Sequence, residues 1–278
     1  MTWRYVESRD LDGPLAVRMA SVWRHRRLLR RMAERDLRQR YVGSALGFAW
    51  AVINPLVFVA IYAVIFTFVF GGRLSPEAPT AQYALYVVSG LLPWVAFSEV
   101  ASKATQAMGE HRNLVKHVVF PVQILPLTSL YAIAFSQAVG LAAVLVLAAI
   151  VRGGLDASVL LLPVVLVLQL VFLAGVAWLL GALGAVFRDV KEILQVVLMV
   201  GMFLTPIFYV EAILPRPMRL LIALNPLTHL VRLYRGVFMG QGMAHPESIA
   251  IFAIVAGGGL LIGFIAFERT RVFLSDIL

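Results

Sequence analysis

The chain has 278 residues, of which 61% are apolar, and it carries a formal net charge of +9 and no cysteine. The apolar fraction and the mean hydropathy of +0.88 exceed those of water-soluble domains, so we expect an integral membrane protein. The lack of cysteine excludes disulfides and thiolate metal sites. Because the positive charge is concentrated near the N-terminus, anionic lipids explain it better than nucleic acid does.

The first forty residues hold eleven arginines, from Arg4 to Arg40, and an almost uncharged apolar run follows them. This run begins too late and extends too far for a signal peptide. Within Pro14–Tyr41, apolar residues at helical spacing predict one amphipathic helix; they are Leu15, Met19, Val22, Leu29, Ala33 and Leu37. We expect this helix to lie along the inner membrane surface, either as a lipid anchor or as a docking surface for a cytoplasmic partner.

Six apolar segments are long enough to cross a bilayer core, which takes about 20 helical residues. We therefore predict an all-α membrane protein with a cytoplasmic segment 1–44 and a transmembrane domain 45–278. Its spans lie at about 45–70, 85–107, 121–151, 157–187, 193–209 and 248–267. The dense arginines place the N-terminus in the cytoplasm, and six crossings return the C-terminus there. Seventeen lysines and arginines then lie inside and six outside, as the positive-inside rule requires.

The second span carries two charges, Glu99 and Lys103, which are costly in a membrane unless they are paired or face water. Four residues apart on a helix, they can form an ion pair. Alternatively, with Ser98, Ser102 and Gln106, they form a polar face toward a conduit.

Two segments between spans carry a recognisable pattern. Glu110–Phe120, on the cytoplasmic side, is either a plain connector or a short helix that docks in a groove of another protein. Glu211–Pro246, on the outer side, predicts two short helices, the second starting at Asn225–Pro226 with asparagine as the cap. That helix carries His229, Arg232 and Arg235 on one side, which indicates either an outward gate or a basic rim on the outer leaflet.

Large side chains recur every four residues along the first span and form a ridge on that helix: Trp50, Asn54, Phe58, Tyr62, Phe66 and Phe70. Any one of these aromatic residues could simply pack against a neighbouring helix or lipid. As a set they favour contact with a passing sugar chain, because aromatic rings stack on the apolar faces of sugar rings.

No catalytic motif accompanies these features. The sequence lacks a phosphate-binding G-x-x-x-x-G-K-[ST] loop, an HExxH motif and a GxSxG motif, and its five histidines are scattered singly. We therefore expect no metal or cofactor on this chain and no enzyme activity of its own. Paired carboxylates within spans are also missing, which argues against proton coupling, so the energy for transport must come from a partner.

Four stretches, in order along the chain, resemble the ABC-2-type permeases that export polysaccharides. They are RDLRQRYVGSALGFAWAVINPL (35–56), SGLLPWVAFSE (89–99), NLVKHVVFPVQILPL (113–127) and the run from FRDVKEILQ to LNPLTHLVRLYRG (187–236). The resemblance is greatest to O-antigen permeases, with teichoic-acid and capsule permeases more distant. It implies two copies of this chain with two ATP-binding subunits, and ATP and Mg²⁺ held by those subunits.

The resemblance also implies residue roles. The surface that couples to the ATP-binding subunit is expected to contain Glu110, His111, Arg112, Asn113, Leu114, Lys116, Arg188 and Asp189. The translocation path, with Trp50 from the ridge, is expected to contain Phe58, Tyr62, Phe66, Phe203, Phe208 and Tyr209. The outer gate is expected to contain Asn225, Pro226, His229 and Arg232.

These observations predict a homodimeric permease that exports a lipid-linked polysaccharide, such as O-antigen, across a bacterial inner membrane. Its partners would be an ATP-binding subunit, a second copy of the chain, the glycan and membrane lipids, with no nucleic acid. One alternative is an ABC-2 exporter of drugs or small lipids. Alternatives of other classes are a membrane-embedded glycosyl- or acyltransferase and a structural membrane scaffold.

Overall fold

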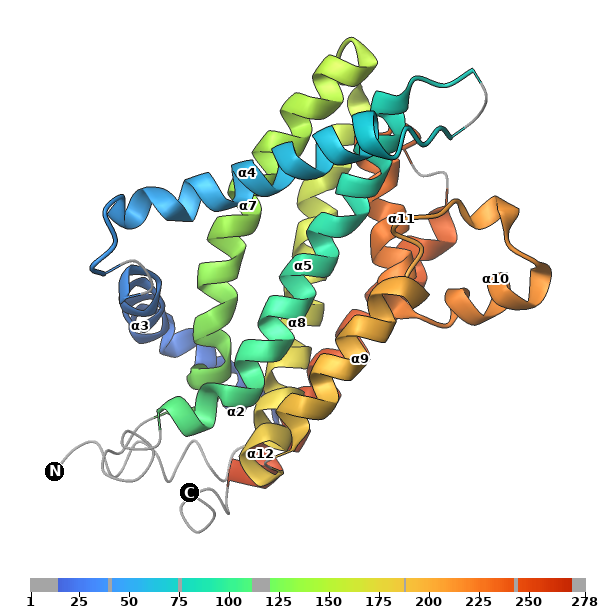
Figure 1. Cartoon of the computed structure of the whole chain (residues 1–278). Coiled ribbons are helices and arrows are strands. Elements are labelled where there is room, and N and C mark those ends of the chain that lie inside the picture. Colours follow the sequence, from blue (N-terminus) through green and yellow to red (C-terminus); the bar gives the residue numbers. More distant parts are fainter. Residues whose placement is uncertain are drawn as a thin grey trace, which may run out of the picture.

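All regular secondary structure in the computed structural model is helical over the residues it describes, which are 15–39, 42–74, 77–111, 121–187, 189–242 and 245–271 (Figure 1). The α-helices are α2 (Leu15–Arg24), α3 (Arg26–Gln39), α4 (Trp50–Val64), α5 (Thr80–Glu110), α7 (Leu125–Arg152), α8 (Leu162–Val186), α9 (Val190–Leu204), α10 (Arg216–Ala223), α11 (Pro226–Phe238) and α12 (Pro246–Arg271). Single turns precede α4 (Gly47–Ala49), α7 (Val122–Ile124), α8 (Ala157–Leu161) and α10 (Glu211–Ile213), and a π-turn (Ile65–Val69) follows α4.

Five helical segments in the described residues are long and apolar enough to cross a membrane: Gly47–Val69, Thr80–Glu110, Val122–Arg152, Ala157–Val186 and Pro246–Arg271. They coincide with five of the six predicted spans, and the protein is a multi-pass membrane protein. The predicted fifth span, 193–209, corresponds to α9, a helix of 15 residues that ends at Leu204. It ends there because Pro206 pushes the preceding Thr205 into an extended conformation, with ψ of 132°.

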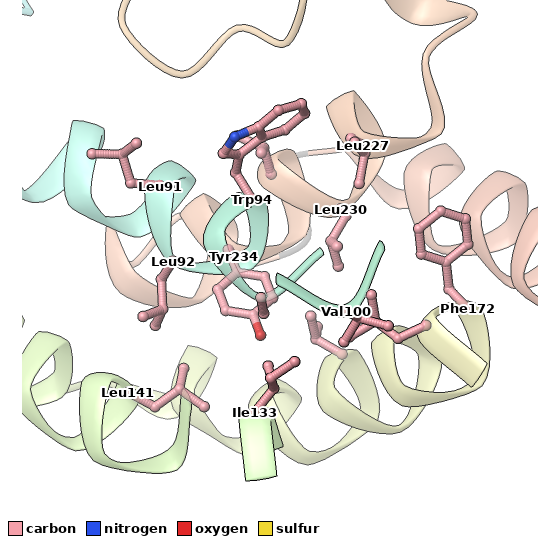
Figure 2. Close-up of a cluster of buried hydrophobic side chains, with 14 of the residues drawn as sticks. Leu91, Leu92, Trp94, Val100, Ile133, Leu141, Phe172, Leu227, Leu230 and Tyr234 are labelled. Carbon is pink, nitrogen blue, oxygen red and sulfur yellow. The ribbon is translucent and has the colours of Figure 1, made fainter. Parts of the chain in front are cut away.

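Helix α5 forms the centre of the structure and packs against α7, α8 and α11. In its most apolar window 72% of the residues are buried, whereas only 11% are buried in that of the first candidate span. Figure 2 shows the core beside α5, where Leu92 and Val100 lie on the side of Ile133 of α7, with Tyr234 of α11 between them, and Trp94 points to the opposite side. The protein is therefore organised around its second span.

Helices α8 and α12 approach each other closely through glycines. A Cβ atom added to Gly175 of α8 would lie 2.5 Å from the carbonyl oxygen of Gly259 on α12. Gly263 of α12 faces the backbone of Gly175 in the same way. Helices in membranes associate through small residues of this kind, because close backbone contact maximises van der Waals packing.

The N-terminal region forms two helices, α2 and α3, where we predicted one over residues 14–41. They are separated by a turn at His25, whose backbone N–H is shared between the carbonyls of Ser21 (3.0 Å) and Val22 (3.2 Å). Helix α3 packs on α7 and buries Met32, Ala33 and Leu37, two of which belong to the predicted apolar face.

An ion-pair cluster connects α2 to the end of α12. Glu268 is 5% exposed, and its carboxylate lies 3.1 Å from Arg18 of α2 and 3.4 Å from Arg271. A buried carboxylate needs such partners, because an isolated charge in the interior is strongly unfavourable. The cluster fixes the start of the amphipathic region against the last span, a contact that the sequence patterns did not indicate.

Two helices present uncovered apolar faces. On α4, exposed side chains include Val52, Leu56, Val57, Ile61 and Val64. On α9, they include Ile193, Val196, Val197, Met199, Val200 and Phe203. Figure 1 shows α4 crossing one side of the helix bundle and α9 lying along its edge. These faces are suited to lipid or to another protein chain.

Candidate translocation path and coupling surface

Aromatic rings from the first span form a continuous row. The ring centroids of Phe58 and Tyr62 are 4.5 Å apart, those of Tyr62 and Phe66 are 6.2 Å apart, and those of Phe66 and Phe70 are 5.1 Å apart. The i, i+4 spacing brings successive rings together on one side of a helix, and the π-turn Ile65–Val69 carries the row to its end. The ridge predicted from the sequence therefore exists over these four residues, whereas Trp50 lies at the opposite end of α4.

The segment that follows α9 joins this row. The ring of Phe208 lies 5.8 Å from that of Phe66, in a stacked arrangement, and Phe203 lies 6.2 Å from Phe208. The hydroxyl of Tyr209 donates a hydrogen bond to the carbonyl of Phe203 at 3.1 Å, which holds the bend after α9. Five of the predicted path residues are thus in one aromatic cluster built from two distant parts of the chain.

Two further tyrosines belong to this cluster, and the sequence analysis missed them. The ring of Tyr83 lies 5.9 Å from Phe66 and 6.3 Å from Tyr86. Their hydroxyls donate to the carbonyls of Phe208 (2.6 Å) and Tyr209 (3.0 Å). Their i, i+3 spacing at the start of the second span was an available signal, because it places both rings on the same helix face.

The charged residues of the second span border two cavities. Glu99 lines a cavity of about 260 Å³ between α4, α5 and α7, together with Asn54, Ser136 and Gln137. Lys103 lines a second cavity of about 480 Å³, which also contains Arg35, Asp36, Gln39, Glu110 and His111. Both alternatives for these charges, the polar face with Ser98, Ser102 and Gln106 and the Glu99–Lys103 ion pair, stay predictions.

The second outer helix begins at the predicted cap. The side-chain oxygen of Asn225 accepts a hydrogen bond from the Leu227 N–H at 3.0 Å, and Pro226 occupies the first helical position. The side-chain amide of Asn225 also donates to the hydroxyl of Thr205 at 2.9 Å. This cap therefore connects the start of α11 to the end of α9.

The alternative of a basic rim formed by the second outer helix is wrong, because two of its three basic residues are buried. His229 is 3% exposed and Arg235 is 6% exposed. Arg232 forms an ion pair with both carboxylate oxygens of Glu211, and this hydrogen bonding raises the pKa of Arg232. Helix α11 is buried almost all round, because 11 of its 13 residues are buried, so His229 and Arg235 lie inside the protein and not on a rim.

The surroundings of His229 favour the neutral form of its side chain. Its Nε2 lies 2.9 Å from the Ala223 carbonyl, and its Nδ1 lies 3.1 Å from the Ser248 hydroxyl. With a proton on Nε2, the imidazole donates to the carbonyl, and the unprotonated Nδ1 then accepts from the hydroxyl. Burial, the main cause, lowers the pKa of His229 below its usual value.

We therefore expect the protein to become less stable as the pH falls below about 6.5, the usual histidine pKa. The unfolded chain takes up a proton there that the folded His229 resists, so acid favours unfolding. Thermal unfolding in detergent between pH 8 and pH 5 measures this effect. His229→Gln should reduce the pH dependence, because it removes the buried group that resists protonation. If the melting temperature of His229→Gln depends on pH as strongly as that of the wild type, His229 is not the cause of the acid sensitivity.

The predicted coupling residues that the structure describes lie at one end of the bundle. Glu110 ends α5 and is exposed, and the next residue, His111, has its Nδ1 3.0 Å from the Ala107 carbonyl. Asp189 is exposed at the start of α9. Arg112, Asn113, Leu114, Lys116 and Arg188 lie outside the described residues. In Figure 1 the end of α5, the start of α9 and the end of α12 lie at the same end of the molecule.

No grouping of three or more histidine and acidic side chains suited to a metal ion occurs in the described ranges. The polar groups of the site are arginines, tyrosines and amides, together with the carboxylates, Lys103 and His229 described above. The aromatic cluster and the cavities therefore suit a binding surface or conduit.

Comparison with known proteins identifies the family. The ABC-2 type transporter family matches residues 27–239. An O-antigen export system permease protein of Myxococcus xanthus is 31% identical over 237 residues, which cover 84% of this chain and 89% of that protein. A permease of the same name from Klebsiella pneumoniae is 26% identical, covering 89% and 93%. The polysialic acid transport protein KpsM of Escherichia coli is 24% identical, covering 85% and 90%. The chain belongs to the ABC-2 type transporter family.

Proposed function

We propose that this chain is the permease subunit of an ATP-driven exporter of a lipid-linked polysaccharide, with O-antigen as the cargo. The observation that carries the proposal is the near full-length similarity to two O-antigen export permeases and to a polysialic acid transporter. The aromatic cluster around Phe66 gives the glycan a chemically suitable surface. The chain itself is a permease and not an enzyme, since ATP hydrolysis would belong to a separate subunit that also holds the Mg²⁺.

The proposed assembly contains two copies of the chain in the bacterial inner membrane. Helix α9, with the bend after it, serves as a short sixth crossing, so both termini lie in the cytoplasm. The uncovered apolar faces of α4 and α9 support a second copy as their partner, because burial of such faces between two chains excludes lipid from a polar conduit. In this arrangement the aromatic clusters of the two copies line the path, with Trp50 at its inner end.

The path residues would bind sugars weakly. Aromatic rings contact the C–H faces of sugar rings without requiring a particular hydroxyl pattern, so successive sugars can occupy the same rings. The row from Phe58 to Phe208 offers several such rings in sequence. A polymer can therefore slide along it, because a sugar that leaves one ring meets a similar ring beside it.

The free energy of ATP hydrolysis would be coupled to transport at the end of the molecule opposite the aromatic cluster. The segment from Glu110 to Lys116, with Arg188 and Asp189, is the proposed contact for the ATP-binding subunit. The N-terminal amphipathic helices α2 and α3 would lie on the inner membrane surface beside that subunit. Because α5 is a single helix from Thr80 to Glu110, a displacement at Glu110 is transmitted directly to Tyr83 and Tyr86. The outer gate would be formed by α10 and α11, with Asn225, Pro226, His229 and Arg232 as its residues.

Removal of the gene from its host tests the proposal. Lipid-linked glycan should accumulate inside the cell, and the intact gene should restore it to the surface. The double variant Asn113→Ala with Lys116→Ala should insert normally and yet fail to restore export, because it removes polar side chains from the coupling surface. Surface glycan that is unchanged without the gene would overturn the polysaccharide assignment.

A second candidate function, export of a drug or small lipid, is favoured by one observation. A cavity of about 560 Å³ lies between α5, α8, α9, α10 and α11, and its lining is almost entirely apolar, including Trp94, Phe97 and Phe172. Such a cavity suits a small apolar molecule. In the same gene-removal test, this function predicts normal surface glycan together with increased retention of an apolar dye.

A further inference from the structure

A polar cavity lies at the end of the bundle opposite the coupling surface, beside the aromatic cluster. It has a volume of about 450 Å³ and is lined by Tyr86, Val210, Glu211, Ala212, Arg219, Arg232, Arg235, Gln241 and His245. Three of these residues are arginines and one is a glutamate, so the lining carries an excess of positive charge. Arg232 also belongs to the proposed gate and Tyr86 to the aromatic cluster, but the cavity between them has no role in the proposed path or gate.

Arg235 is the unusual member of the lining, because it is buried without a carboxylate partner among the described residues. It is 6% exposed, and its guanidinium lies 3.4 Å from the centroid of the Tyr86 ring. Its hydrogen bonds go to the carbonyls of Ile207 at 2.9 Å and Tyr86 at 3.5 Å. Burial lowers the pKa of Arg235 to about 10, which leaves it cationic at neutral pH.

The neighbouring residues do not neutralise this charge. The carboxylate of Glu211 is already bound by Arg232, whose Nε donates to its two oxygens at 3.0 and 3.1 Å. Arg219 of α10 adds a further positive charge at the exposed rim. The protein walls of the cavity strengthen the positive electrostatic potential of these arginines, because the low dielectric of the protein limits screening by water. An anion inside the cavity would be attracted to Arg235 and Arg219.

We propose that this cavity binds a phosphate group, carried by a lipid head group at the outer end of the path. Guanidinium groups bind phosphate oxygens in a bidentate manner, and Gln241 and His245 provide further donors in the same lining. The ring of Tyr86 belongs both to this cavity and to the aromatic cluster, so a phosphate here would sit where the cluster ends. The assignment of this phosphate to the exported glycan lipid rests on the proposed function. The phosphate site itself does not depend on that function, because it is inferred from the cavity and its arginines.

The test uses the permease purified with its ATP-binding subunit, and native mass spectrometry to count bound ligand. The probes are dioleoyl phosphatidic acid, dioleoylglycerol (the same lipid without phosphate), inorganic pyrophosphate and glucuronate. We expect phosphatidic acid to bind and dioleoylglycerol not to bind. Displacement by pyrophosphate would support a free phosphate as the ligand, and resistance to it would support the lipid. Equal displacement by glucuronate would overturn the phosphate assignment.

Substitutions of the lining arginines test whether phosphatidic acid binds in this cavity. Arg219→Gln and Arg235→Gln should each weaken phosphatidic acid binding roughly tenfold, the effect of removing one charge-assisted hydrogen bond. Arg216→Gln is the matched control, because Arg216 lies on α10 and is exposed but does not line the cavity. Arg219 is also exposed, so its variant should fold even if Arg235→Gln does not. Wild-type binding in Arg219→Gln would overturn the proposal, whether or not the protein exports glycan.

Discussion

Gly175→Ala is expected to destabilise the protein by about 3 kcal/mol, the upper range for inserting atoms into a packed interface. The added Cβ would lie 2.5 Å from the Gly259 carbonyl and 2.6 Å from the Leu260 nitrogen. Both neighbours are backbone atoms of α12, so no side-chain rotation can relieve the clash. The melting temperature of the detergent-solubilised protein, followed by size-exclusion chromatography after heating, measures the effect.

Gly257→Ala provides the control for this substitution. Gly257 lies on α12, and a Cβ added there would meet no atom within 4 Å. Alanine has a higher helix propensity than glycine, by about 1 kcal/mol, so this variant should melt at or slightly above the wild-type temperature. If Gly175→Ala also melts at the wild-type temperature, α8 and α12 do not depend on backbone contact at this point.

Phe66→Leu is expected to lower the rate of glycan export about tenfold while the protein remains in the membrane. Phe66 contacts the rings of Tyr62, Phe70, Tyr83 and Phe208. Aromatic contacts contribute about 0.5–1.5 kcal/mol beyond their buried area, and leucine keeps the apolar volume while removing the ring. Surface glycan per copy of the permease measures the effect, in the gene-removal host described above.

Phe68→Leu is the matched control, two residues along the same π-turn. No ring contact joins Phe68 to the cluster among the described residues and its side chain is 79% exposed, whereas Phe66 is 7% exposed and lies within the cluster. Export should therefore be normal in Phe68→Leu if the cluster around Phe66 forms the path. If Phe66→Leu is present at the wild-type level and exports glycan normally, the aromatic cluster is not part of the translocation path.

The positions of the helices were largely predictable from local sequence. Five long apolar runs coincide with the five helices able to cross a membrane, because a bilayer imposes a minimum apolar length that can be counted along the chain. The start of α11 at Asn225–Pro226 was predictable for a similar reason, since capping depends on neighbouring residues alone. The fifth predicted span was placed less well, because Pro206 ends α9 before the apolar run ends.

Contacts between distant residues were not predictable in this way. The stacking of Phe208 on Phe66, the burial of Arg235 against Tyr86 and the ion pair of Glu268 with Arg18 each join segments more than a hundred residues apart. The basic pattern of α11 was visible, yet it indicated an outward gate or a basic rim and not a buried cation beside a cavity. Helical periodicity shows that residues share a face, but it does not show what that face meets.

The membrane class, the helical elements and the aromatic row on the first span can all be predicted from the amino-acid sequence, because each depends on local apolarity, capping or spacing. The central place of α5, the two tyrosines that extend the aromatic cluster and the cationic cavity beside it became visible in the folded protein. These three features follow from how the helices cross. Crossing depends on close packing at a few small residues, such as Gly175 and Gly263, and not on the average composition of a span.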